Sequence, residues 1–231
     1  MTNVVYPTQI ATLWTTPETD FRYAIQLTLP QNLGLVFGAV LLTVLGQRIQ
    51  RWRWTLTASV FIMVLFGALL ALGTPTNRGT IMAMVFLCMT GFGWAQYLSI
   101  AYIQFGAPQV ELGIAGGLAG VARFAGGSIA ISVYTTILTN VVQKQAVQKV
   151  IPAVLSAGGS EEVATEILAS LPLGAAALAK IPDATAEFIA AAGAAYQQAY
   201  VVGLRTTALS SLSFGIIAII GESNKSVLNP A

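Results

Sequence analysis

Long apolar runs separated by short polar segments are the main pattern in this sequence. A helix needs about 20 mostly apolar residues to cross the hydrocarbon core of a bilayer, and five of the runs reach that length. The pattern therefore predicts an all-α protein, built as a polytopic membrane helical bundle. We expect four spans in residues 23–142 and one more near the C-terminus: 23–46, 54–73, 79–104, 112–142 and 200–221.

The remaining segments are too short or too polar to cross a bilayer. Residues 1–22 are interpreted as the remnant of a truncated span, 2–14, followed by an external loop. Residues 143–199 mix alanines with scattered charges and prolines, which favours an extracellular loop of two or three short amphipathic helices. Residues 222–231 are polar and are predicted to be a cytoplasmic tail.

A short loop between the first two spans carries three clustered arginines, Arg48, Arg51 and Arg53. Positive charge in short loops marks the cytoplasmic side of a membrane protein. This cytoplasmic loop therefore fixes the predicted orientation. It places the N-terminal segment and residues 143–199 outside, and the C-terminus in the cytosol.

The span at residues 112–142 is unusually rich in glycine. Small residues four positions apart allow membrane helices to approach each other closely. We therefore predict that one face of this helix packs tightly against a neighbour. The glycines assigned to this helix-packing role are Gly113, Gly116, Gly117, Gly120 and Gly127.

Arg123 lies in the same span, beside the glycine stripe. An arginine at the centre of a membrane helix costs at least ~2.5 kcal/mol on insertion scales, so it should face protein or water. Two interpretations remain open. The arginine is either paired with a neighbouring backbone carbonyl in a packed helix, or it takes part in a transport cycle.

Aromatic and amide side chains mix in the second half of the span at 79–104. Such a mixture suits an amphipathic organic substrate, and the alternative is ordinary packing beside an interfacial aromatic belt. The amides near Pro30 also need partners inside a membrane, which places them in the bundle interior or along a cavity. The candidates for a substrate cavity are Gln26, Asn32, Trp94, Gln96, Tyr97 and Arg123.

Composition supports an integral membrane protein, because 55% of the residues are hydrophobic and only 9% are charged, against about 25% charged in soluble domains. Cys88 is the single cysteine and histidine is absent, so we expect no intramolecular disulfide, no metal site and no cofactor. A net charge of +2 gives no reason to expect a nucleic-acid partner. An enzyme is disfavoured, because no nucleophile–base pair or phosphate-binding loop is recognisable.

The order of these elements resembles the C-terminal half of a fungal major facilitator superfamily transporter. The resemblance rests on the loop GQRIQRWRW, the segment FGWAQYLSIAYIQFGAPQVELGIAGGLAGVARFAGGSIAISVYTTIL and the final span after AYQQAYVVGLR. The most similar group is that of the fourteen-span trichothecene efflux pumps and siderophore-iron transporters. The resemblance implies two six-helix bundles around a central cavity, made of inverted three-helix repeats.

The same resemblance implies proton-coupled efflux of toxins, drugs or other amphipathic organic molecules, in the plasma membrane or the vacuolar membrane. Siderophore-iron uptake is the alternative within the fold, and a non-transporting truncated membrane protein is the alternative of another class. The expected partners are the lipid bilayer, a small organic substrate and the missing N-terminal six-helix bundle. Because the acidic residues lie in loops or at span ends, the titrating carboxylate is expected in that bundle, with Arg123 as its counter-charge.

Overall fold

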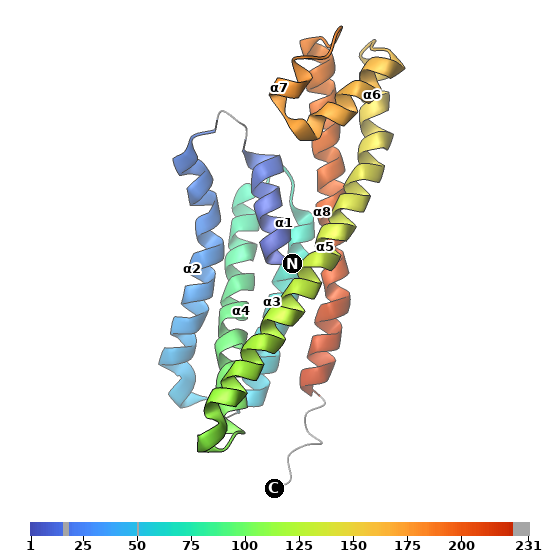
Figure 1. Ribbon diagram of the computed structural model, residues 1–231. Helices are drawn as coiled ribbons and strands as arrows, with labels where there is room; N and C mark the ends of the chain where they lie inside the picture. The colour runs from blue at the N-terminus through green and yellow to red at the C-terminus, as the bar shows by residue number, and fades with distance from the viewer. Residues whose placement is uncertain (16–18, 50, 224–231) are drawn as a thin grey trace. The chain divides into compact units, whose positions relative to one another are not determined.

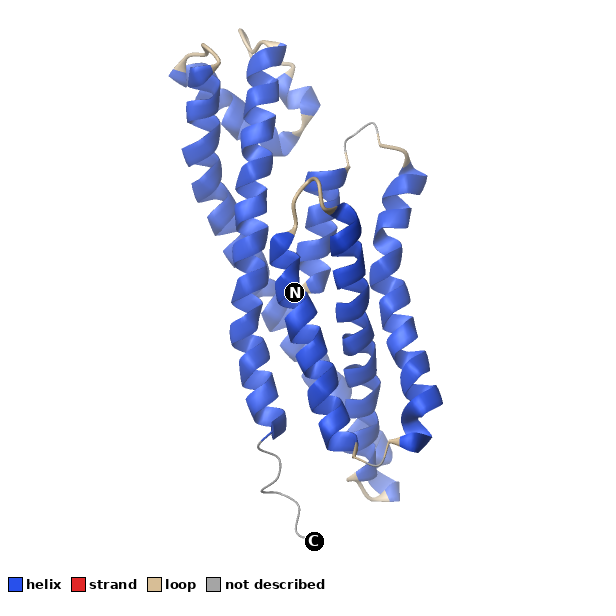
Figure 2. Cartoon of the chain, turned by 180° about the vertical axis from the view of Figure 1, so that it is seen from behind, coloured by secondary structure: helices blue, strands red, loops and turns tan. Residues whose placement is uncertain are grey.

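The computed structural model describes residues 1–15, 19–49 and 51–223, with only the backbone described at 175, 176, 222 and 223. Within these ranges every regular element is a helix (Figure 2). Five helices are long and apolar enough to cross a membrane, which confirms the predicted all-α membrane bundle. The chain divides into two compact units, the first formed by Met1–Tyr134 and Thr207–Ala231 and the second by Thr135–Thr206.

The helices follow one another along the chain with short 3-10 turns at several junctions (Figure 1). Their bounds are α1 Thr2–Gln9 with a π-helix at Ile10–Trp14, α2 Phe21–Leu45, α3 Trp52–Leu69, α4 Arg78–Phe105, α5 Leu112–Ser156, α6 Glu161–Ser170, α7 Ala175–Leu178 and α8 Ala186–Ser223.

In the first unit, α4 packs against both α2 and α3. Glycines make these contacts close. A Cβ built at Gly34 of α2 would lie 2.5 Å from the carbonyl oxygen of Phe86, and one built at Gly91 of α4 would lie 2.9 Å from the carbonyl oxygen of Ser59 in α3. Because a backbone oxygen cannot rotate away, these positions exclude larger residues.

The short helix α1 is anchored to the first unit by side chains that donate to backbone carbonyl oxygens. Tyr6 donates its hydroxyl hydrogen to the carbonyl oxygen of Leu27 in α2. Gln9 Nε2 lies 2.9 Å from the carbonyl oxygen of Leu70, at the end of α3. Val5, Tyr6 and Gln9 are fully buried, so residues 2–14, although too short to span a membrane, form a well-packed element of this unit (Figure 1).

The two longest helices extend further than their predicted spans. α5 continues past residue 142 to Ser156, through Pro152, and α8 begins at Ala186 rather than at residue 200. At 1.5 Å per residue, 45 residues of helix measure about 67 Å, more than twice the ~30 Å hydrocarbon core. Short separate helices are therefore confined to the segment between Ser156 and Ala186. Residues 143–156 extend α5 because their glutamines and lysines favour helix, and residues 186–199 extend α8 because they are rich in alanine.

The second unit has its own apolar core. It is formed where α6 and α7 pack with the C-terminal part of α5 and the N-terminal part of α8. Ser160 caps α6, with its hydroxyl oxygen accepting from the backbone N–H of Val163 at 3.3 Å. The buried core residues are Ala146, Val150, Val154, Ala164, Ile167, Leu178, Ala192, Ala195 and Ala199.

Candidate functional site

A cavity of about 680 Å³ lies in the first unit, where α3, α4, α5 and α8 meet the start of α1. We call it the Arg123 cavity. Its walls are mostly apolar, and Tyr134 and Phe214 form an edge-to-face pair at 5.8 Å on one of them. The residues that line it are Met1, Thr2, Asn3, Met63, Val64, Cys88, Met89, Phe92, Arg123, Gly126, Gly127, Ala130, Ile131, Tyr134, Ser211, Phe214, Gly215 and Ala218.

A second cavity of about 260 Å³ adjoins the first, and both are lined by Met63, Phe92 and Arg123. On α4, this second cavity also contacts Gln96 and Ser99. Phe92, Gln96 and Ser99 are spaced four and three residues apart, so they lie on one face of the helix. That face of α4 therefore runs continuously along both cavities.

Arg123 is the one charged side chain among the residues that line the two cavities. Its guanidinium carbon lies 5.6 Å from the centroid of the Phe124 ring. Within the described part of the chain, no acidic side chain forms an ion pair with it. A cation over an aromatic face gains only ~0.5–2 kcal/mol, so its N–H donors remain available to an anion or an oxygen acceptor.

Gln96 supplies an acceptor beside the same arginine. Its Oε1 atom is buried and has no hydrogen-bond partner among the described residues. The Ser99 hydroxyl does not donate to this atom, because it donates to the backbone carbonyl oxygen of Gln96 at 2.9 Å. An unpaired buried amide oxygen costs about 1–3 kcal/mol, and a ligand with a donor group would remove that cost. The described residues contain no group of three or more His, Cys, Asp or Glu placed to hold a metal ion.

The structure brings together only two of the six predicted cavity residues, Arg123 and Gln96. Trp94 lines neither cavity and packs against the cluster of Leu56, Ala95 and Leu98. Tyr97 also lines neither cavity and is 46% exposed. These two residues sit on other faces of α4, because successive helix positions are rotated by about 100°.

The two predicted residues on α2 are also separate from Arg123. Gln26 lines a shallow groove of about 360 Å³ along α2 and α4, together with Pro30 and Phe86. Asn32, on α2, is exposed. The helix continues through Pro30 to Leu45. Among the described residues these two amides therefore line no cavity together with Arg123, and their role in a substrate cavity stays a prediction.

The predicted glycine face of α5 has no close neighbour among the described residues. A Cβ built at Gly113, Gly117, Gly120 or Gly127 meets no atom within 4 Å, and one at Gly116 meets only Gln104 Nε2, at 3.5 Å. The tight glycine contacts of this unit are instead on α2 and α4. The spacing of α5 permits a close approach, but no described residue packs closely against these glycines.

Several cavity residues were missed by the sequence analysis, notably Met63, Phe92, Tyr134 and Phe214. Phe92 could have been found, because it lies one helical turn before Gln96 on the same face. The other three lie on different helices, and no local pattern signals which apolar side chains of separate helices will meet.

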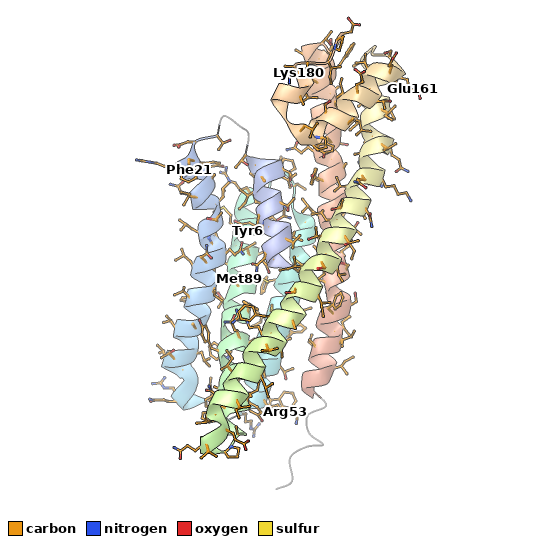
Figure 3. All side chains as sticks on the ribbon, viewed as in Figure 1. Tyr6, Phe21, Arg53, Met89, Glu161 and Lys180 are labelled. Carbon is orange, nitrogen blue, oxygen red and sulfur yellow. The ribbon has the colours of Figure 1, made fainter. Side chains whose placement is uncertain are left out.

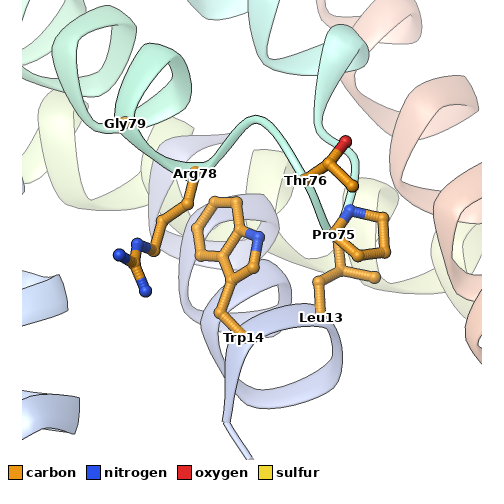
Figure 4. Close-up of a pocket in the computed structure, with 6 residues that line it drawn as sticks. All are labelled: Leu13, Trp14, Pro75, Thr76, Arg78 and Gly79. Atoms are coloured by element: carbon orange, nitrogen blue, oxygen red, sulfur yellow. The ribbon is translucent and has the colours of Figure 1, made fainter.

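A third cavity, of about 430 Å³, lies at the turn between α3 and α4 (Figure 4). Arg78 and Trp14 line it, and the Arg78 guanidinium carbon lies 5.3 Å from the centroid of the Tyr23 ring. Trp14 Nε1 donates to the carbonyl oxygen of Thr74 at 3.1 Å. A tryptophan, a tyrosine and an arginine at the ends of apolar helices are typical of the membrane–water interface.

Comparison with known proteins gives a match over nearly the whole chain. Residues 1–226 match the family described as fungal trichothecene efflux pump (TRI12). The chain belongs to this family. It is similar to an MFS-type transporter, prx5, of Penicillium rubens, with 42% identity over 94% of this chain and 39% of the relative.

A second relative is the trichothecene efflux pump TRI12 of Fusarium sporotrichioides, which is 22% identical over 95% of this chain and 37% of its own length. The chain thus spans about two fifths of the length of these curated relatives. No solved structure matches it. The family and its apolar helices show an integral membrane protein of the major facilitator type, as the resemblance predicted. Both relatives are named as transport proteins.

Proposed function

We propose that this chain forms one part of an efflux transporter that exports toxins, drugs or other amphipathic organic molecules by alternating access. The observation that carries the proposal is the Arg123 cavity, with its volume of about 680 Å³. Small-molecule sites measure about 300–1,000 Å³ and combine apolar walls with a few polar groups. In this chain, Arg123 and Gln96 are the polar groups that would orient a substrate.

The substrate that fits these walls is largely apolar and carries oxygen acceptors. Phe92, Ile131 and Phe214 would contact its hydrocarbon body, and the Arg123 guanidinium would donate to an oxygen atom. The name of the Fusarium relative, a trichothecene efflux pump, supports trichothecenes or similar compounds as the first substrates to test.

The proposal includes a second helical bundle and proton coupling. The relatives are longer than this chain, which supports a partner bundle that completes the transporter. None of the described acidic side chains lines the Arg123 cavity or the second cavity beside it. We therefore infer that the titrating carboxylate comes from that bundle and that Arg123 is its counter-charge, because a nearby cation stabilises the ionised carboxylate. The plasma membrane or the vacuolar membrane is the proposed location.

A matched pair of leucine variants on α5 tests the cavity. Gly127→Leu projects into the Arg123 cavity and Gly113→Leu does not, yet a Cβ at either position meets no atom within 4 Å. The chain would be joined to the N-terminal bundle of a relative and expressed in yeast that lacks its own drug pumps. Because the leucine side chain would occupy space that the substrate needs, and one group too many in an apolar pocket costs about 1–3 kcal/mol, we expect trichothecene efflux by Gly127→Leu to fall about fivefold or more. Gly113→Leu should retain efflux.

The same strains separate the alternatives. Accumulation of an iron–siderophore complex, without trichothecene efflux, would favour the uptake alternative. Absence of both activities in the joined protein, when it is folded and at the membrane, would favour a non-transporting role. Equal efflux by the two leucine variants would remove the Arg123 cavity from the substrate path.

A further inference from the structure

Another cavity of about 680 Å³ lies in the first unit, where α3 begins and α4 ends. We call it the Arg51 cavity. It lies in the region of Arg53, at the opposite end of the unit from Phe21 (Figure 3). Its lining residues are Arg51, Trp52, Arg53, Trp54, Tyr102, Phe105 and Gly106.

The walls of the Arg51 cavity are aromatic and open to the outside. The rings of Trp52 and Phe105 meet edge to face, with centroids 5.8 Å apart. Trp54 and Phe105 are 68% and 76% exposed. Such exposure is costly in water and favourable at the boundary between lipid headgroups and hydrocarbon, where tryptophan is enriched. The cavity therefore combines a rigid aromatic wall with side chains suited to contact lipid.

The charge of the Arg51 cavity is positive. Arg51 and Arg53 both line it, and no lining residue is acidic. The start of α3 adds a smaller contribution, because Arg51, its N-cap residue, provides no side-chain cap and the positive end of the helix dipole is left open. Arg51 and Arg53 belong to the arginine loop that the sequence predicts to lie in the cytosol. The cytoplasmic leaflet carries anionic lipids, which attract basic side chains near the membrane.

We propose that the Arg51 cavity binds the headgroup of an anionic phospholipid. Arg51 and Arg53 donate to the phosphate oxygens, and Trp54 and Phe105 contact the glycerol and the upper acyl chains. The exposed aromatic side chains favour a lipid over a soluble anion, because a free phosphate ion would contact the arginines alone. The site is separate from the Arg123 cavity and does not depend on transport.

Lipid titration of the purified full chain tests this site, with bound lipids resolved by native mass spectrometry. The probes are 1-palmitoyl-2-oleoyl phosphatidylserine and the corresponding phosphatidylcholine, with inorganic phosphate as the soluble anion. We expect tighter binding of phosphatidylserine than of phosphatidylcholine. Arg51→Gln should weaken phosphatidylserine binding about fivefold, the effect of one basic residue at an anionic surface, and Arg51→Lys should retain most of it.

Arg48→Gln is the matched control, because Arg48 lies in the same loop and is exposed but does not line the cavity. It should change phosphatidylserine binding by less than about twofold. Trp54→Ala should weaken both lipids while the protein keeps its helical circular dichroism spectrum. Equal losses in Arg48→Gln and Arg51→Gln would show general attraction rather than a site. Displacement of phosphatidylserine by an equal concentration of inorganic phosphate would show a soluble-anion site, and either result would overturn the proposal.

Discussion

Replacing Gly34 with alanine is expected to destabilise the packing of α2 on α4. A Cβ at this position would lie 2.5 Å from the carbonyl oxygen of Phe86 and 3.0 Å from Met89 Cβ. Ordinary van der Waals contact starts at about 3.4 Å, so the two helices must separate locally by about 0.9 Å. The oxygen belongs to the backbone of α4 and cannot move without the helix.

The magnitude follows from two opposing effects. Overpacking a close-packed site costs about 1–3 kcal/mol, and the overlap with a backbone oxygen at Gly34 places the cost in the upper part of that range, at about 2–3 kcal/mol. Alanine is favoured over glycine inside a helix by up to about 1 kcal/mol. The net loss in free energy of unfolding should therefore be about 1–2 kcal/mol for Gly34→Ala. The matched control is Gly120→Ala in α5, where a Cβ meets no atom within 4 Å and only the helix propensity changes.

Thermal unfolding in detergent, followed by circular dichroism at one fixed scan rate, measures the difference in stability between the two variants and the unmodified chain. We expect the Tm of Gly34→Ala to fall by roughly 2–8 °C and that of Gly120→Ala to stay level or rise. If Gly34→Ala unfolds at or above the temperature of Gly120→Ala, the close contact between α2 and α4 is not present in the protein.

Three further predictions concern orientation, charge and capping. In a Cys88→Ser background, cysteines at Gln47 and Glu162 should react with a membrane-impermeant maleimide from opposite sides; reaction from one side would reject the five-span topology. In the transporter assembled with a partner bundle, Arg123→Lys should keep efflux, while Arg123→Gln should lose it. Arg123→Gln should also shift the pH profile of the efflux that remains, because removing a cation raises the pKa of a nearby carboxylate. An unshifted profile would indicate a structural role for Arg123. Ser160→Ala should lose about 1 kcal/mol at the start of α6, measured as about fivefold faster amide exchange in its first turn, and unchanged exchange would show that the cap contributes nothing.

The membrane helices could be predicted from the sequence because the bilayer sets a minimum length of apolar residues. The length of an apolar run does not determine how far a helix continues beyond the bilayer. It therefore could not predict that α5 ends at Ser156 or that α8 begins at Ala186. Hydropathy falls after residue 142, but the helix continues to Ser156 because the glutamines and lysines that follow still favour helix. Polarity and helix propensity are separate properties, and hydropathy reports only the first.

Glycine spacing shows a second limit. The pairs Gly34–Gly38 and Gly113–Gly117 have the same separation in sequence. Only the first pair meets a neighbouring helix among the described residues. Small residues permit two backbones to approach, but which helix lies opposite is decided by the whole bundle.

The candidate site was partly predictable. Arg123 could be identified because a charge inside an apolar run is rare and costly. Trp94 and Gln96 were grouped by composition, yet two helix positions differ by about 200° in direction, so they point to opposite sides of α4. Helical spacing pairs Gln96 with Phe92 and separates it from Trp94.

The most direct measurement of the proposed function is substrate protection of a cysteine in the Arg123 cavity. In the transporter assembled with a partner bundle and carrying Cys88→Ser, the rate of maleimide labelling would be measured for Gly127→Cys and Gly113→Cys, with and without a trichothecene. The account predicts that the trichothecene slows labelling at Gly127→Cys, which lines the cavity, and leaves Gly113→Cys unchanged. Equal labelling rates at Gly127→Cys with and without bound trichothecene would contradict it.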